Sequence, residues 1–185
     1  WLQDECAPFA PPLDALAAEL RGDPDMAGRW FYPLDRMRAA DRVRAVYPPW
    51  NLHWDYQGAQ PVADWLARDR WSLPRRFELP SAEQRQPFDL PQFAPGLAHW
   101  HQARVPLYQD TGVLVCHNAP ECFPEFPAEA AALFQVARYR SAWQLPVEQR
   151  RPRLVILGDS FGDAIADPLA PYFAEVWYLS MNQLA

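Results

Sequence analysis

The sequence predicts an α/β domain built on a parallel sheet. The continuous apolar run at 154–157 (LVIL) is typical of a strand buried on both faces of such a sheet. The chain then has a glycine that permits a tight turn, followed by a helix-compatible segment over 161–173. With 185 residues, half of them apolar, the chain is long enough to bury one core. We therefore expect a single domain over residues 1–185.

The elements before the middle of the chain follow from local patterns. Apolar residues at helical spacing predict helices over 13–21 and 58–70, and a shorter helix fits about 34–40. The aromatic stretch 29–32 (RWFY), which precedes a proline, suits a short strand. Residues 47–50 (YPPW) cannot be helical, because a residue before a proline is pushed to extended geometry. This stiff loop leads directly into the segment that carries the base candidate.

The second half of the chain is less regular. Residues 71–110 are polar, punctuated by prolines and without a clear period, so we expect an irregular insertion there. A short strand fits 113–116, a helix fits 128–138 and a strand fits 176–179. The chain starts with Trp rather than Met and stops just after this last strand. We expect it to be a fragment, truncated at both ends, of a longer protein.

Charge argues against nucleic acid as a partner, and hydropathy argues against a membrane-spanning helix within the sequence. The net charge is −6 and no basic stripe occurs, so nucleic-acid binding is rejected. No apolar run approaches the roughly 20 residues that a membrane-spanning helix needs.

Two of the three cysteines, Cys116 and Cys122, bracket a short, turn-rich loop. A disulfide can close this loop in an oxidising compartment, and two semi-buried free thiols fit the sequence equally well. A zinc site that also uses His117 is less favoured, because no fourth ligand with recognisable spacing is present. We therefore expect no metal.

Ser160 is the candidate nucleophile. It follows Gly158 and Asp159 at the carboxyl end of the predicted strand, which is where α/β sheets place their chemistry. The helix that starts at Phe161 would bring backbone N–H groups close to the Ser160 hydroxyl, where they can stabilise an oxyanion. In the alternative interpretation, Ser160 only caps this helix. The buried strand before it and Phe161 after it favour the nucleophile.

His53 is the candidate base, because a serine nucleophile needs a neutral imidazole and a group that orients it. It lies on the stiff loop, two residues after Asn51. Trp50 and Trp54 flank this segment and fit either stacking on sugar rings or packing in the core.

The other two histidines that could contribute, His99 and His101, are interpreted as an exposed, flexible pair without a role in the site.

Together these motifs resemble the AlgX/AlgJ-like branch of the SGNH hydrolase superfamily, which contains alginate and related polysaccharide O-acetyltransferases. The matching pieces are Asn51-Leu-His53-Trp54, Gly58-Ala59 and Gly158-Asp159-Ser160-Phe161. Their order, with the base first and the nucleophile last, is the permuted order of that branch. The resemblance covers most of residues 13–180 and implies an SGNH-hydrolase-like fold of three layers.

The resemblance also implies an activity. Ser160 would take an acetyl group from a donor and pass it to a polysaccharide or cell-envelope glycan, without a cofactor. It further implies a periplasmic or envelope location and a membrane-bound partner protein that supplies acetyl groups. Two alternatives stay open: a carbohydrate acetylesterase that uses the same site, and a glycan-binding or scaffold domain that has lost catalysis.

One position departs from the family pattern, which has Asp where this chain has Asn51. The amide oxygen can still accept from the His53 ring and set its tautomer, but it gives no charge to stabilise an imidazolium. We therefore expect activity to be low, absent, or rescued by a nearby carboxylate such as Asp55.

Overall fold

The computed structural model describes residues 12–26, 28–43, 45–48, 51–75, 77–87, 100–109, 111, 113–127, 129, 136–141 and 152–180. The chain divides into two compact units, Trp1–Asp35 and Arg36–Ala185. The prediction of one domain over 1–185 stays a prediction. Among the helices of the described segments, none combines the length and the apolar character needed to cross a bilayer.

The first unit contains helix α1 (Pro12–Gly22), as its apolar spacing predicts. The strand predicted over 29–32 is wrong, because none of those residues lies in a strand. The chain turns at Gly28, where φ is 78°, and the N–H groups of Arg29 and Trp30 both bond to the carbonyl of Met26. Helix α2 (Leu34–Asp41) starts at the end of this unit and continues into the second.

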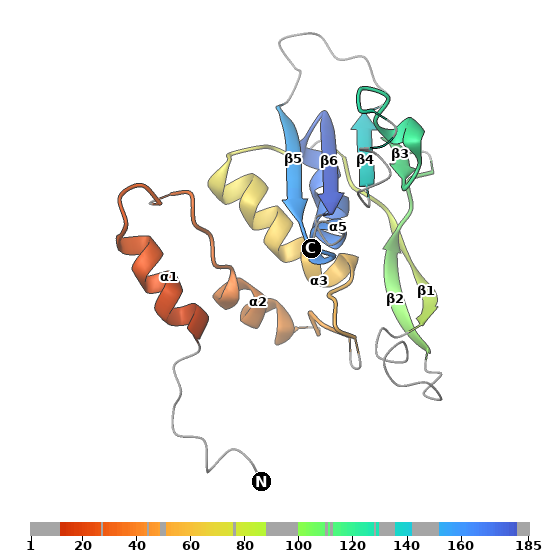
Figure 1. Cartoon of the computed structure of the whole chain (residues 1–185). Helices are drawn as coiled ribbons and strands as arrows, with labels where there is room; N and C mark the ends of the chain where they lie inside the picture. Colours follow the sequence, from red (N-terminus) through yellow and green to blue (C-terminus); the bar gives the residue numbers. More distant parts are fainter. Residues whose placement is uncertain are drawn as a thin grey trace. The chain divides into compact units, whose positions relative to one another are not determined.

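The second unit is a mixed α/β fold around an open sheet (Figure 1). The strand order is β3-β4-β6-β5, and the strands are β3 (Val113–His117), β4 (Val136–Ser141), β5 (Arg153–Gly158) and β6 (Glu175–Ser180). Among the described strands, β5 and β6 pair in parallel, while the β3–β4 and β4–β6 pairs are antiparallel. The predicted parallel sheet is therefore found in part, as a sheet of mixed orientation whose parallel pair is joined by a helical crossover.

That crossover is helix α5 (Phe161–Leu169), followed by a 3-10 turn over Ala170–Tyr172. It packs against helix α3 (Tyr56–Asp64), which continues as a π-helical segment over Trp65–Arg70. Side chains of both helices and of the sheet form one buried core, which includes Ala63, Ala166, Leu169, Tyr139 and Val176. Both helices were predicted from the sequence.

Strand β5 has one buried face and one exposed face. Leu154 and Ile156 pack against the core, whereas Val155 is 51% exposed and Leu157 is 62% exposed. The prediction of a strand buried on both faces is therefore wrong. β5 is an edge strand, and no described residue buries its outer face. The structure thus supports the mixed α/β class and does not reproduce the three-layer arrangement.

The segment expected to be an irregular insertion, 71–110, contains an antiparallel ribbon (Figure 1). Its strands are β1 (Ser81–Pro87) and β2 (Trp100–Pro106). The helix predicted over 128–138 is wrong at 136–138, which begin β4, while 128 and 130–135 lie outside the described residues. Because β4 pairs with a neighbour on each side, tertiary pairing overrides its local helical pattern.

Candidate active site

Ser160 and His53 form a hydrogen-bonded pair. Nε2 of His53 lies 2.5 Å from Oγ of Ser160, although the two residues are 107 positions apart in the sequence. Ser160 occupies the turn between β5 and α5, and His53 comes from the loop before α3. This is the contact that a serine nucleophile and its general base require.

Asp159, rather than Ser160, caps the helix. Ser160 is at the N-cap position of α5 but makes no side-chain capping bond. The Asp159 carboxylate accepts from the Phe161 N–H at 3.0 Å, and the Asp159 carbonyl accepts from the Gly162 N–H at 2.9 Å. The interpretation of Ser160 as a cap is therefore wrong. Two of the N–H groups expected to stabilise an oxyanion are also already bonded.

Further contacts hold the turn that carries Ser160. The Tyr178 hydroxyl, from β6, donates to the Asp159 carbonyl at 2.7 Å. A Cβ at Gly162 would lie 2.7 Å from the Tyr178 ring, so this close approach of α5 to the sheet requires glycine. Gly158 ends β5 opposite Ser180 and has open space where a Cβ would lie. A side chain would therefore fit at this position, and Gly158 is notable only as the last residue of the strand before Asp159 and Ser160.

Aromatic side chains tie the His53 loop to α5. The Trp54 indole N–H donates to the Phe161 carbonyl at 3.0 Å. The Phe161 ring lies 4.9 Å from the His53 ring and 6.1 Å from the Trp54 ring, centroid to centroid. Phe161 thus packs against the His53 ring, and its predicted support of an oxyanion stays a prediction. Stacking of Trp54 on a sugar stays a prediction, and Trp50 lies outside the described residues.

The same loop is anchored at the start of α3. The Asp55 carboxylate accepts from the Gly58 N–H at 2.8 Å and so serves as the N-cap of this helix. A Cβ at Gly58 would lie only 2.0 Å from the Val46 carbonyl oxygen, so a glycine is needed where the two backbones meet. Because Asp55 is engaged as a cap, the expectation that it replaces the missing orienting carboxylate is not supported.

Asn51 contacts a histidine that the sequence interpretation left out of the site. Its Nδ2 lies 3.5 Å from Nε2 of His101, a half-buried residue of β2. The interpretation of His101 as exposed and flexible is therefore wrong, while His99 lies outside the described residues. In the strand around His101 (WHQARVP), the apolar Ala103 and Val105 alternate with the polar Gln102 and Arg104, and this alternation was the signal that could have placed His101 on the inward face.

These residues line one cavity of about 320 Å³. Its polar lining comes from the loop before α3, from the ribbon and from α5, and includes Asn51, His53, Gln86, His101, Arg104, Ser160, Asp163 and Asp167. Ser160, Asp163 and Asp167 follow the spacing i, i+3 and i+7, which places them on one helical face. This spacing was the signal by which the two carboxylates could have been found in the sequence.

Asp167 is the most perturbed carboxyl in the cavity. Burial raises its pKa to about 6, although a hydrogen bond from the Tyr108 hydroxyl acts in the opposite direction. Burial also raises the pKa of Tyr108 well above its ordinary value. A buried acid with a raised pKa in a cavity lined by other polar side chains is typical of functional clefts.

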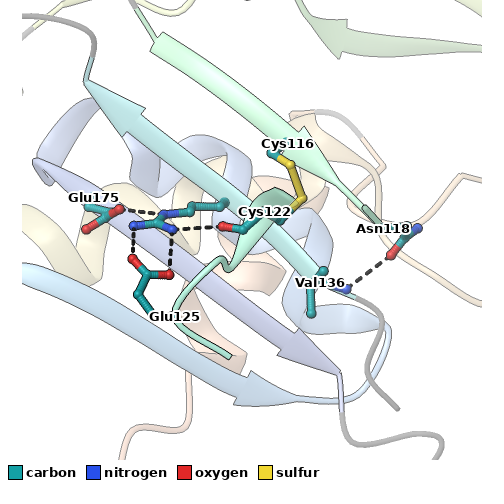
Figure 2. Close-up of a disulfide and its surroundings, with 7 residues drawn as sticks. Cys116, Asn118, Cys122, Glu125, Val136 and Glu175 are labelled. Carbon is teal, nitrogen blue, oxygen red and sulfur yellow. Dashed lines mark hydrogen bonds and ion pairs between the residues drawn. A yellow bond between two sulfur atoms is a disulfide. The ribbon is translucent and has the colours of Figure 1, made fainter. Parts of the chain in front are cut away.

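The cysteine loop forms a separate feature (Figure 2). Cys116 and Cys122 are joined by a disulfide with a Cα–Cα distance of 5.3 Å, so neither offers a thiolate to zinc. Beside them, the Arg138 guanidinium donates to the Cys122 carbonyl and to the carboxylates of Glu125 and Glu175. In the part of the chain that the structure describes, no group of three or more His, Cys, Asp or Glu residues is placed to hold a metal.

No protein-family model and no curated protein matches the chain. Among solved structures, a DHHW family protein from Eubacterium siraeum matches with 17% identity and a TM-score of 0.50, over 79% of this chain and 54% of that chain. Bacillus cereus PatB1 matches with 14% identity and a TM-score of 0.39, over 77% of this chain and 56% of that chain. The chain thus spans about half the length of each.

These findings overturn the assignment to the AlgX/AlgJ-like branch of the SGNH superfamily. No family model matches the chain, and the solved structure that matches with a TM-score of 0.50 is of a DHHW family protein. At 17% identity the first match indicates a shared fold and nothing about activity. The family assignment is therefore corrected to a likeness of fold: this chain is similar in structure to the DHHW family protein.

Proposed function

We propose that the chain is a serine acyltransferase that forms an acetyl-enzyme at Ser160 and passes the acetyl group to a glycan hydroxyl. The observation that carries the proposal is the 2.5 Å contact between His53 Nε2 and Ser160 Oγ. The cavity around this pair is lined by carboxylate and amide groups, including Asp163, Asp167 and Gln86. Such groups hydrogen-bond to hydroxyls, which supports a sugar as acceptor.

In this mechanism, Ser160 Oγ attacks the carbonyl carbon of the acetyl donor while its proton passes to His53 Nε2. The tetrahedral intermediate collapses, and His53 returns the proton to the leaving group. An acceptor hydroxyl then gives its proton to His53 and attacks the acetyl-enzyme. Collapse of the second intermediate releases the acetylated product and restores the Ser160 hydroxyl with the proton from His53. Water in place of the sugar would make the same site an esterase.

The second candidate is a glycan-binding domain that has lost catalysis. Asn51 favours it, because an amide supplies no negative charge to stabilise the His53 imidazolium during the reaction. For either candidate we propose a location outside the cytoplasm. The disulfide between Cys116 and Cys122 supports this location, because oxidising compartments preserve such bonds. A membrane-bound acetyl donor protein stays a prediction.

The test is covalent labelling by a serine-directed phosphonate, followed by mass spectrometry of the labelled peptide. We expect labelling at Ser160 in the native chain, none in Ser160→Ala, and strong slowing in His53→Ala. His117→Ala is the matched control, because this exposed histidine does not line the cavity. Folded protein that does not label at Ser160 would refute the enzyme and leave the binding domain.

The acceptor is identified in a second experiment with p-nitrophenyl acetate and a mixture of neutral oligosaccharides. Acetylated sugar among the products supports the transferase. Free acetate alone, at the same rate with and without sugar, supports the esterase. Because both products need Ser160, the Ser160→Ala variant controls for spontaneous transfer.

A further inference from the structure

The contact between Asn51 and His101 joins the loop before α3 to the ribbon. Both side chains line the cavity that holds Ser160 and His53, and the two nitrogens lie 3.5 Å apart. An amide nitrogen carries two hydrogens and has no acceptor lone pair. His101 must therefore accept through Nε2, which requires a neutral ring with its proton on Nδ1.

This contact fixes the orientation of the Asn51 side-chain amide. Its donor end meets His101, so Oδ1 is the end that can accept from other groups. His53 receives the Ser160 proton at Nε2, and its neutral ring therefore carries the hydrogen on Nδ1. Only the oxygen end of an amide can accept that hydrogen. A reversed amide would present N–H to N–H and would orient His53 poorly.

We propose that His101 is a positioning residue for the Ser160–His53 pair, and that it acts by fixing which end of the Asn51 amide is presented to His53. This inference rests on the proposed function. A carboxylate at position 51 would have two equivalent oxygens and would need no such control. The contact with His101 is therefore useful because position 51 carries an amide, whose two ends differ.

The ribbon gives His101 a fixed place. His101 pairs with Gln86 in the strand register, so the two side chains share one face, and Ala103, which is 4% exposed, lies on the same face. The buried Ala103 shows that this face is turned inward. His101 therefore reaches the cavity from a hydrogen-bonded strand.

The test is a double-mutant cycle on the rate of phosphonate labelling at Ser160, in the native chain and in Asn51→Asp. Coupling between residues in contact predicts that His101→Leu slows labelling about tenfold in the native chain and less than about twofold in Asn51→Asp. His101→Gln, which keeps an acceptor, should label faster than His101→Leu in the native chain. Equal slowing by His101→Leu in both backgrounds would overturn the proposal, because His101 would then act independently of the amide.

Nitrogen-15 NMR of the imidazole rings gives a readout that does not depend on activity. We expect a neutral His101 with its proton on Nδ1, and an Nε2 resonance that moves in Asn51→Ala. A His101 proton on Nε2 would overturn the inference even if Ser160 is reactive. If no variant labels at Ser160, including the native chain, the proposed function fails and the positioning role fails with it. If Ser160 is labelled but His101→Leu slows labelling equally in the native chain and in Asn51→Asp, only the positioning role is overturned.

Discussion

Replacement of Asp167 by Asn should change how the stability of the protein depends on pH. Asp167 lines the Ser160 cavity, and burial raises its pKa from 3.8 to about 6. Tyr108 donates a hydrogen bond to it, and Asp163 lies one turn earlier on the same helix. Asp167→Asn keeps an acceptor oxygen for Tyr108 and removes the charge.

Proton binding by Asp167 decides whether the free energy of unfolding rises or falls with pH. The folded state holds the Asp167 proton more tightly than the unfolded state, so between about pH 4 and 6 it binds more protons. The free energy of unfolding therefore falls as pH rises through this window and is constant above it. The difference between 3.8 and about 6 corresponds to about 3 kcal/mol, at about 1.4 kcal/mol for each tenfold change in proton affinity. Asp167→Asn should recover up to this amount at neutral pH and nothing below pH 4.

The measurement is urea unfolding followed by tryptophan fluorescence, at several pH values from 4 to 7.5, for the native chain and Asp167→Asn. Asp69→Asn is the matched control, because the Asp69 carboxylate is about half exposed and pairs only at the surface with Arg36. The control should give a small difference that barely varies with pH. A constant difference between Asp167→Asn and the native chain across the whole range would refute the reasoning.

Three further changes test the supports of the site and of the sheet. Trp54→Phe removes the indole N–H that bonds to α5, so we expect a loss of about 1 kcal/mol in denaturant unfolding and slower labelling of Ser160; unchanged labelling would contradict this role. Gly58→Ala places a Cβ 2.0 Å from the Val46 carbonyl oxygen, so we expect thermal melts to show a loss of at least about 2 kcal/mol in the free energy of unfolding. The control is Gly22→Ala, whose Cβ would have no atom within 4 Å and which should cost no stability. Cys116→Ser opens a disulfide loop with a sequence separation of 6, which predicts a loss of about 2 kcal/mol in urea unfolding; equal midpoints for variant and native chain would count against it.

Local signals in the sequence predicted several of the helices and pointed to Ser160 and His53. The spacing of apolar residues predicted α3 and α5, because a helix that buries one face repeats its apolar side chains every three to four residues. Ser160 was identified as a candidate nucleophile because Gly-Asp-Ser directly follows a predicted strand. The stiff loop before α3 identified His53. Each of these inferences depended on residues that are neighbours in the chain.

Contacts between distant segments were beyond the reach of such signals. Strand β4 forms where the sequence favoured a helix, because it pairs with β3 on one side and with β6 on the other. His101 enters the site because β2 carries it on the same face as the buried Ala103, and the alternation along β2 indicates this face but not that it meets the loop of Asn51.

The sequence alone therefore predicted which residues are candidates to react, since Ser160 and His53 carry the side chains that a nucleophile and its base require. Only the tertiary structure decided which atoms meet. It placed the Ser160 hydroxyl against His53, engaged the Asp159 carboxylate at the start of the helix, brought the Asn51 amide to His101, and raised the pKa of Asp167 by burying it. Distance and solvent exclusion set these properties, and both depend on how segments far apart in the chain pack together.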